Sequence, residues 1–99
     1  MAKKGYWIGH VDVTNPERYG DYIAANAVPF KKFGARFLVR NGEVTVPEGN
    51  LAGRRHVVIE FPSYADAKAC YESPEYRAAI KIRSEASTGD LIIIEGHEE

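Results

Sequence analysis

The chain has 99 residues, which is enough for one domain with a single core and too few for a second domain. Its 13 basic and 14 acidic residues leave a formal net charge of −1 at pH 7, without a long run of either sign. We therefore expect no nucleic-acid partner and no attraction to an anionic membrane. No apolar stretch approaches the roughly 18 residues of a membrane-spanning helix, and no signal peptide is recognisable, which favours a cytoplasmic protein. The lone Cys70 fits a reducing compartment, and we interpret it as a small packed apolar residue.

The N-terminal part of the chain predicts a strand followed by a helix. Residues Tyr6–Val13 carry aromatic and β-branched side chains without a proline, a pattern typical of a strand. Either Thr14 or Asn15 can cap the helix that follows. Pro16 suits the first helical turn, and Glu17 completes a capping-box spacing with Thr14.

The body of this first helix is marked by one stripe of large side chains. Its members recur at three- and four-residue spacing and are Tyr19, Tyr22, Ile23, Asn26, Phe30 and Phe33. Gly34 is a natural end for the helix, because glycine adopts the left-handed conformation that often closes one. Pro29 lacks a backbone N–H and is expected to kink the last turn.

The middle of the chain predicts two strands joined through a turn and a loop. Ala35–Arg40 is the second strand, and the Asn41–Gly42 pair after it is a strong tight-turn signal. Glu43–Val46 is then expected to fold back as a short extension. A polar loop, Pro47–Gly53, leads to the third strand, Arg54–Phe61.

The C-terminal part predicts a broken helix and a last strand. Ser63 with Asp66 has the spacing of a cap, and Ser73-Pro74-Glu75 repeats the arrangement of cap, proline and acid. We therefore expect two helical segments at an angle, ended by Gly89. The segments are Tyr64–Tyr71 and Glu75–Ala86, and the fourth strand is Leu91–Glu95.

The order strand, helix, strand, strand, helix, strand indicates an α+β fold, the ferredoxin-like βαββαβ sandwich. Right-handed crossovers place the strands of a mainly antiparallel sheet in the order fourth, first, third, second, with the helices on one face. We expect one ferredoxin-like domain over residues 1–99, with a core at about 5–96 and a tail at 97–99.

Alternation along the strands divides their side chains between two faces of the sheet. The face expected toward the helices carries Trp7, Val11, Val13, Phe37, Val39, Val57, Ile59 and Phe61. The opposite face is expected to carry Tyr6, Ile8, His10, Leu38, Arg40, His56, Val58 and Glu60. That second set is too apolar to leave in water as one patch, which predicts a homodimer packed through this face.

Several short motifs together resemble one protein family, over about residues 6–96. They are Asn15-Pro16-Glu17 with Tyr19 and Tyr22, the run 34–42, the run 58–63, Ser73-Pro74-Glu75-Tyr76 with Arg83, and Ile94-Glu95-Gly96. On these residues the chain resembles the domain-of-unknown-function 1330 family of the dimeric α+β barrel superfamily, although that pattern usually has glycine where Ala35 and Asn41 stand. The resemblance implies a ferredoxin-like fold and dimerisation. It implies no settled activity, because the superfamily includes cofactor-free monooxygenases, isomerases, haem enzymes and members with no known chemistry.

Two polar residues interrupt the helical stripes and suggest a pocket between the helices and the sheet. Asn26 lies at the centre of the first stripe, and Arg83 at the centre of the second. They can hold a carboxylate or enolate oxygen of a small organic ligand, with Trp7, Tyr22 and Tyr76 as walls. In the alternative, Asn26 bonds the backbone near the expected kink and Arg83 reaches an acid beyond the helix edge.

The opposite sheet face offers a second set of candidate residues. His10 and Glu60 are the candidates for a catalytic acid or base, and Arg40 beside them can fix an anionic substrate. The alternative is a buried ion pair that sets the register of a dimer. We expect no metal site, since His56 and Glu60 are separated by about 13 Å along one strand.

Two classes of function remain open at this point, and the sequence does not decide whether the protein is an enzyme. We predict an uncharacterised dimeric protein with a small-molecule pocket and no cofactor. In the first class it is a cofactor-independent enzyme, a monooxygenase or isomerase, acting on a small oxygenated or aromatic compound. In the second class it is a non-catalytic binding or regulatory module. An enclosed cavity with a titratable residue favours the enzyme, and a filled core favours the module.

Overall fold

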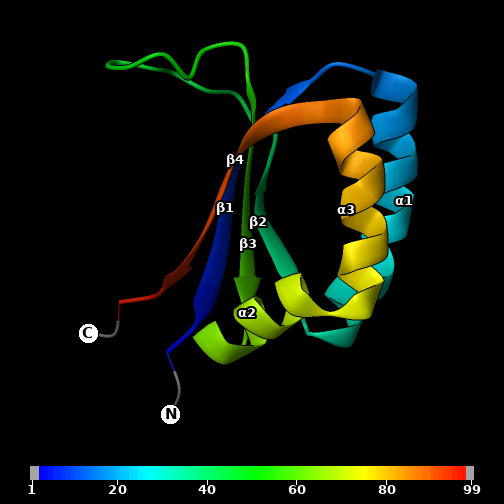
Figure 1. Ribbon diagram of the computed structural model, residues 1–99. Coiled ribbons are helices and arrows are strands. Elements are labelled where there is room, and N and C mark those ends of the chain that lie inside the picture. The colour runs from blue at the N-terminus through cyan, green and yellow to red at the C-terminus, as the bar shows by residue number, and fades with distance from the viewer. Residues whose placement is uncertain (1–2, 98–99) are drawn as a thin grey trace.

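The computed structural model describes residues 3–97. Its elements are β1 (Gly5–Val13), α1 (Pro16–Lys32), β2 (Arg36–Arg40), β3 (Arg55–Phe61), α2 (Tyr64–Glu72), α3 (Pro74–Ala86) and β4 (Ser87–Glu95). The strands form one sheet in the order β2-β3-β1-β4, and each neighbouring pair is antiparallel. All three helices lie on one side of this sheet (Figure 1). The predicted ferredoxin-like topology and strand order are confirmed.

The helix starts follow from the capping residues of the sequence. Asn15 caps α1, because its side chain accepts a hydrogen bond from the backbone N–H of Arg18, so the alternative cap Thr14 is not used. Helix α1 continues through Pro29 to Lys32, and Gly34 follows with a positive φ of 74°. The local signals therefore set both ends of the first helix.

The predicted break between α2 and α3 is confirmed, and one side chain at the break bonds to both helices. The Ser73 hydroxyl donates to the carbonyl of Cys70 at 2.7 Å and accepts from the N–H of Tyr76 at 3.1 Å. It thus satisfies the end of one helix and the start of the next.

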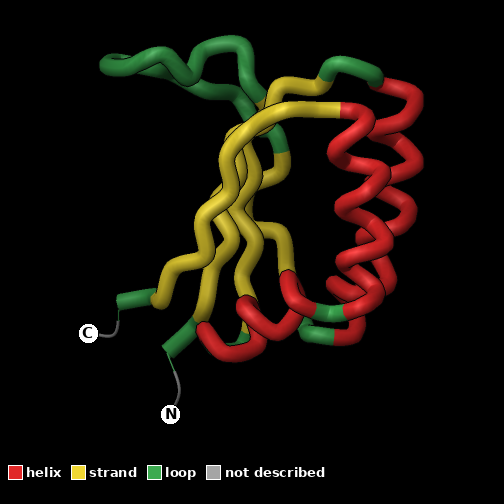
Figure 2. Tube along the Cα trace, in the orientation of Figure 1, coloured by secondary structure: helices red, strands yellow, loops and turns green. Residues whose placement is uncertain are grey.

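Two expected boundaries are wrong. Strand β4 begins directly after α3, at Ser87, and Gly89 lies inside this strand rather than at a helix end. Gly89 pairs with Val11, and a Cβ there would collide with the backbone of β1, which explains the glycine. Glu43–Val46 forms no strand. It belongs to a long loop that projects from one end of the sheet (Figure 2).

A bulge in β2 changes which way its last residues face. Phe37 pairs with Ile59, but Val39 pairs with Val58, so the register shifts at Leu38. Paired residues share a face, and Arg40, opposite Val57, therefore lies on the helix side. The expectation that Val39 faces the helices and Arg40 faces away is wrong for this reason.

The densest packing lies at the end of the sheet next to α2. The Trp7 ring contacts Phe61 and Tyr76 at centroid distances of 5.3 and 4.9 Å, and its Nε1–H donates to the carbonyl of Ala67 at 2.9 Å. Cys70 is fully buried, as expected for a packed residue. Toward the other end, α1 and α3 lie side by side (Figure 1). The layer between these helices and the sheet contains hollows there.

Candidate functional site: a cleft between the sheet and the helices

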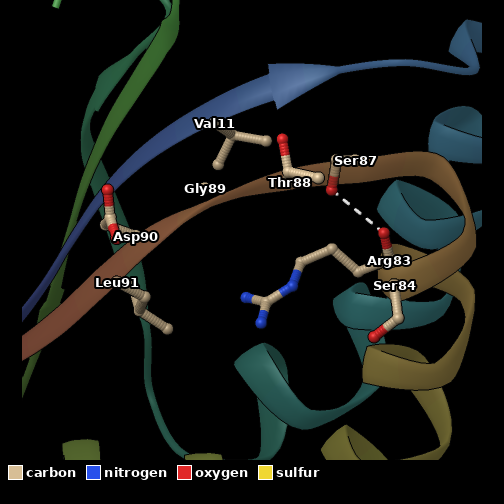
Figure 3. A pocket seen from close by; sticks show the side chains of 8 residues that line it. All are labelled: Val11, Arg83, Ser84, Ser87, Thr88, Gly89, Asp90 and Leu91. Carbon is tan, nitrogen blue, oxygen red and sulfur yellow. Dashed lines mark hydrogen bonds between the residues drawn. The ribbon is translucent and has the colours of Figure 1, made fainter.

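Three neighbouring hollows lie between the sheet and the α1–α3 pair. The outer cavity, of about 340 Å³, lies between the C-terminal end of α3, the first half of β4 and Val11 of β1 (Figure 3). A middle hollow of about 30 Å³ shares Val11, Arg83 and Leu91 with it. An inner hollow of about 30 Å³ shares Tyr19 and Tyr22 with the middle one. Because they share lining residues, the three hollows follow one another from β4 toward β2, and we call them together the cleft.

Arg83 reaches into this cleft from the last turn of α3. Its guanidinium points into the space between α3 and β4, while the carbonyl of the same residue accepts from the Ser87 hydroxyl at 3.0 Å (Figure 3). Arg83 Nη1 donates to the Tyr76 hydroxyl at 3.1 Å, and the Tyr76 and Tyr22 hydroxyls lie 2.8 Å apart. The Arg83 guanidinium and the two hydroxyls therefore form one hydrogen-bonded chain at the cleft, in which either tyrosine hydroxyl can donate to the other.

The tyrosines of the cleft are hydrogen-bond donors rather than bases. Burial raises the pKa of Tyr76 far above its usual range, and the neighbouring Tyr22 raises it further, although Arg83 acts in the opposite direction. Burial also raises the pKa of Tyr19, against the lowering effect of Arg55. Both phenols therefore stay protonated at neutral pH.

The charged side chains of the cleft are mostly basic. Arg83, Arg40 and Arg55 line it, and within residues 3–97 none of them forms an ion pair. The outer cavity has one carboxylate, Asp90, which lies 3.3 Å from Arg54 instead. No other described lining residue is acidic, and none is a histidine. Such an arrangement attracts anions.

Asn26 is the polar residue of α1 in the inner hollow. It is only 5% exposed, and its side chain makes no hydrogen bond within the part of the chain that is described. The expected bond to the backbone near Pro29 is therefore not formed. Arg83 reaches Tyr76 rather than an acid, so the alternative interpretation of both residues is wrong. Asn26 and Arg83 share the cleft, at different hollows.

The expected grouping of His10, Arg40 and Glu60 on the helix-free face is wrong. His10 instead meets His56, its cross-strand partner, with 2.8 Å between their Nδ1 atoms. Glu60 lies about four residues along the strand from that pair and accepts from Tyr6 at 3.3 Å. Its cation is Arg36, at 3.2 Å. The bulge places Arg40 on the other side of the sheet.

Sequence reasoning missed two residues that the structure makes prominent. Arg55 lies in the inner hollow, and its alternation with Val57 and Ile59 was a signal for the helix-facing side. His56 could have been matched with His10, because the antiparallel pairing of β1 and β3 sets them opposite each other. The described residues contain no group of three or more metal-ligating side chains.

The βαββαβ sandwich with its helices on one face is the ferredoxin-like α+β fold. The chain belongs to the family described as Domain of unknown function (DUF1330), whose model matches residues 4–97. No curated protein is significantly similar to it in sequence. None of the helices within residues 3–97 has the length and apolar character needed to cross a bilayer.

Three solved structures illustrate the fold. A protein of unknown function from Rhodopseudomonas palustris is 20% identical, with a TM-score of 0.79 over 100% of this chain and 86% of that one. SnoaB, a cofactor-independent oxygenase from Streptomyces nogalater, is 12% identical, with a TM-score of 0.66 over 99% and 97% of the two chains. A provisionally assigned antibiotic biosynthesis monooxygenase from Nitrosomonas europaea is 12% identical, with a TM-score of 0.61 over 97% and 92%. Likeness at these identities extends to the fold alone.

Proposed function

We propose that the cleft binds a small organic molecule through an anionic oxygen, a carboxylate, phenolate or enolate, held by Arg83. The observation that carries this proposal is the position of the Arg83 guanidinium between the outer cavity and the middle hollow, with no carboxylate paired to it. A guanidinium is always charged and presents donors in a planar fork that suits an oxyanion. Within the described residues, the charge of Arg83 has no counter-ion.

The surroundings of Arg83 fit a ligand of this kind. The outer cavity, at about 340 Å³, lies in the usual size range of small-molecule sites. The hydrogen-bonded hydroxyls of Tyr22 and Tyr76 lie beside the guanidinium, and Trp7 packs against Tyr76 as a buried wall. Val11 and Leu91 add apolar surface where the outer and middle hollows meet.

A cofactor-independent enzyme acting on such a molecule is the second candidate. Donors that converge on an oxyanion stabilise an enolate or phenolate, and the Arg83 guanidinium supplies such donors beside the Tyr22–Tyr76 hydroxyl pair. The fold shared with the oxygenase SnoaB is compatible with this chemistry. The described cleft residues hold no histidine and no unpaired carboxylate, so a substrate would have to ionise without a general base from them.

We also propose that two copies pair through the helix-free face of the sheet. Ile92, Ile94, Leu38 and Val39 remain 41–52% exposed there, beside the half-buried Ile8. An apolar surface of this extent is usually covered in a protein that stays in solution. The cleft is on the other side of the sheet, so one chain holds all the residues named for ligand binding.

The binding proposal is tested with benzoate and its uncharged analogue benzamide, followed by backbone NMR shifts. Benzoate should shift amides around Arg83 and Leu91, and benzamide should bind about tenfold more weakly, since a charge-assisted bond is worth roughly 1.4 kcal/mol or more. Arg83→Gln should remove this difference. Lys81→Gln, which removes an exposed charge from the same helix, should not. No shift with benzoate, or an equal response to both compounds, would contradict the proposal.

A further inference from the structure

Two polar groups that line the inner hollow make no hydrogen bond within the described residues. The Nε atom of Arg55 is enclosed and makes no hydrogen bond. The Asn26 side chain, 5% exposed, also makes none within residues 3–97. More than about 90% of buried polar groups in proteins are satisfied, so the enclosed Arg55 Nε–H calls for an acceptor, and the Asn26 amide beside it is available to a ligand.

The β2 bulge supplies a third donor to the same hollow. Without the shift at Leu38, the strand would turn Arg40 toward the helix-free face. With it, Arg40 lines the inner hollow, and its guanidinium lies over the Phe37 ring at 4.1 Å from the centroid. A guanidinium stacked in this way keeps the N–H groups at its edge available. Bulges that re-aim a side chain are frequent beside active sites.

No acidic side chain among the described lining residues would repel an anion from this hollow or pair with its arginines. Its described lining contains Arg40 and Arg55 and no aspartate or glutamate. Its volume of about 30 Å³ suits the two oxygens of a carboxylate better than a larger ring. Between it and the outer cavity, the middle hollow is lined largely by apolar surface from Trp7, Val57 and Ile59.

We propose that the inner hollow is a second anion-binding site, formed by Asn26, Arg55 and Arg40, and that the ligand of the cleft carries an oxyanion at each end of an apolar spacer. A dicarboxylate has this chemistry. One end is held by Arg83, and this inference rests on the proposed function to that extent. The other end accepts hydrogen bonds from the Arg55 Nε–H, the Asn26 amide and the Arg40 guanidinium.

The test compares succinate, adipate and suberate, each with its own monoamide, by isothermal titration of the full chain. The dicarboxylate whose length matches the cleft should bind about tenfold more tightly than its monoamide. Asn26→Leu and Arg55→Lys should each reduce that ratio toward one while the monoamide binds as before. Arg83→Gln should weaken both compounds, and Lys81→Gln should change neither.

The possible results separate this inference from the proposed function. If monoamides bind through Arg83 but no dicarboxylate exceeds its monoamide, the second site is refuted and the proposed function stands. A ratio that persists in both Asn26→Leu and Arg55→Lys also refutes it. If neither class of compound binds, both proposals are wrong. Arg55→Lys keeps the charge and removes the enclosed Nε donor, so it remains informative if the leucine variant repacks the hollow.

Discussion

Replacing Asn26 by leucine should stabilise the protein. The two side chains have the same branching and the same number of non-hydrogen atoms, and the site is 5% exposed, so leucine exchanges an amide that makes no hydrogen bond for an apolar group whose larger methyl groups extend into the inner hollow. An unsatisfied buried polar group costs about 1–3 kcal/mol. The inner hollow can admit a water, which lowers the expected gain toward about 1 kcal/mol. Better helix propensity adds at most about 0.5 kcal/mol.

The assay is thermal unfolding of the ligand-free protein, followed by circular dichroism. A gain of about 1 kcal/mol raises the Tm of a domain of this size by roughly 4–8 °C. The control is Asn50→Leu, the same exchange at an exposed loop position. It should change the free energy of unfolding by no more than about 0.5 kcal/mol, and so shift Tm less than Asn26→Leu does. A Tm that falls by several degrees in Asn26→Leu would refute the reasoning, because it would show that the amide is bonded and structural.

Three further predictions concern other parts of the molecule. Light scattering at micromolar concentration should report twice the 11.0 kDa chain mass, and Ile92→Lys on the helix-free face should give a monomer whereas Val28→Lys on exposed α1 should not. Glu60→Gln should lower the free energy of unfolding by about 1 kcal/mol or less, because its partner Arg36 is 70% exposed; a loss above about 3 kcal/mol would show that the pair is enclosed, as in a dimer. Burial raises the pKa of Cys70 from 9.0 to about 12, so the folded state retains a proton that the unfolded chain releases. The contribution of this thiol to the free energy of unfolding is fully present below pH 9 and decreases by up to about 1.4 kcal/mol per pH unit above it. Urea unfolding should show this decrease in the wild type and a smaller one in Cys70→Ala.

The fold was predictable because the residues that begin and end the helices agree with the strand order that the sequence of elements requires. Asn15 and Pro16 mark where α1 begins, and Ser73 with Pro74 marks the break between α2 and α3. Each signal acts through a hydrogen bond or a fixed φ angle within about four residues, so no tertiary information is needed. The right-handed crossover then leaves one strand order for this sequence of elements.

The candidate site was less predictable, because it depends on register. Asn26 and Arg83 stood out as polar residues on apolar stripes, and both line the cleft. Arg40 was assigned to the wrong face, because alternation assumes an unbroken strand and the bulge at Leu38 adds one residue. No residue in Arg36–Arg40 is of a type that predicts a bulge. Its position becomes visible only from the pairing of β2 with β3.

The two ends of the layer between helices and sheet differ in how completely their polar groups are bonded. Next to α2 the aromatic core is closed, and even the indole N–H of Trp7 has an acceptor, so that end supplies stability. Toward β2 and the start of β4, the same layer keeps a cleft lined by three arginines that form no ion pair within the described residues and by an amide that makes no hydrogen bond. An apolar filling of that region would stabilise the fold more, as the leucine at position 26 is expected to show. Donors kept without partners beside a closed core are the reason why we propose a ligand in the cleft.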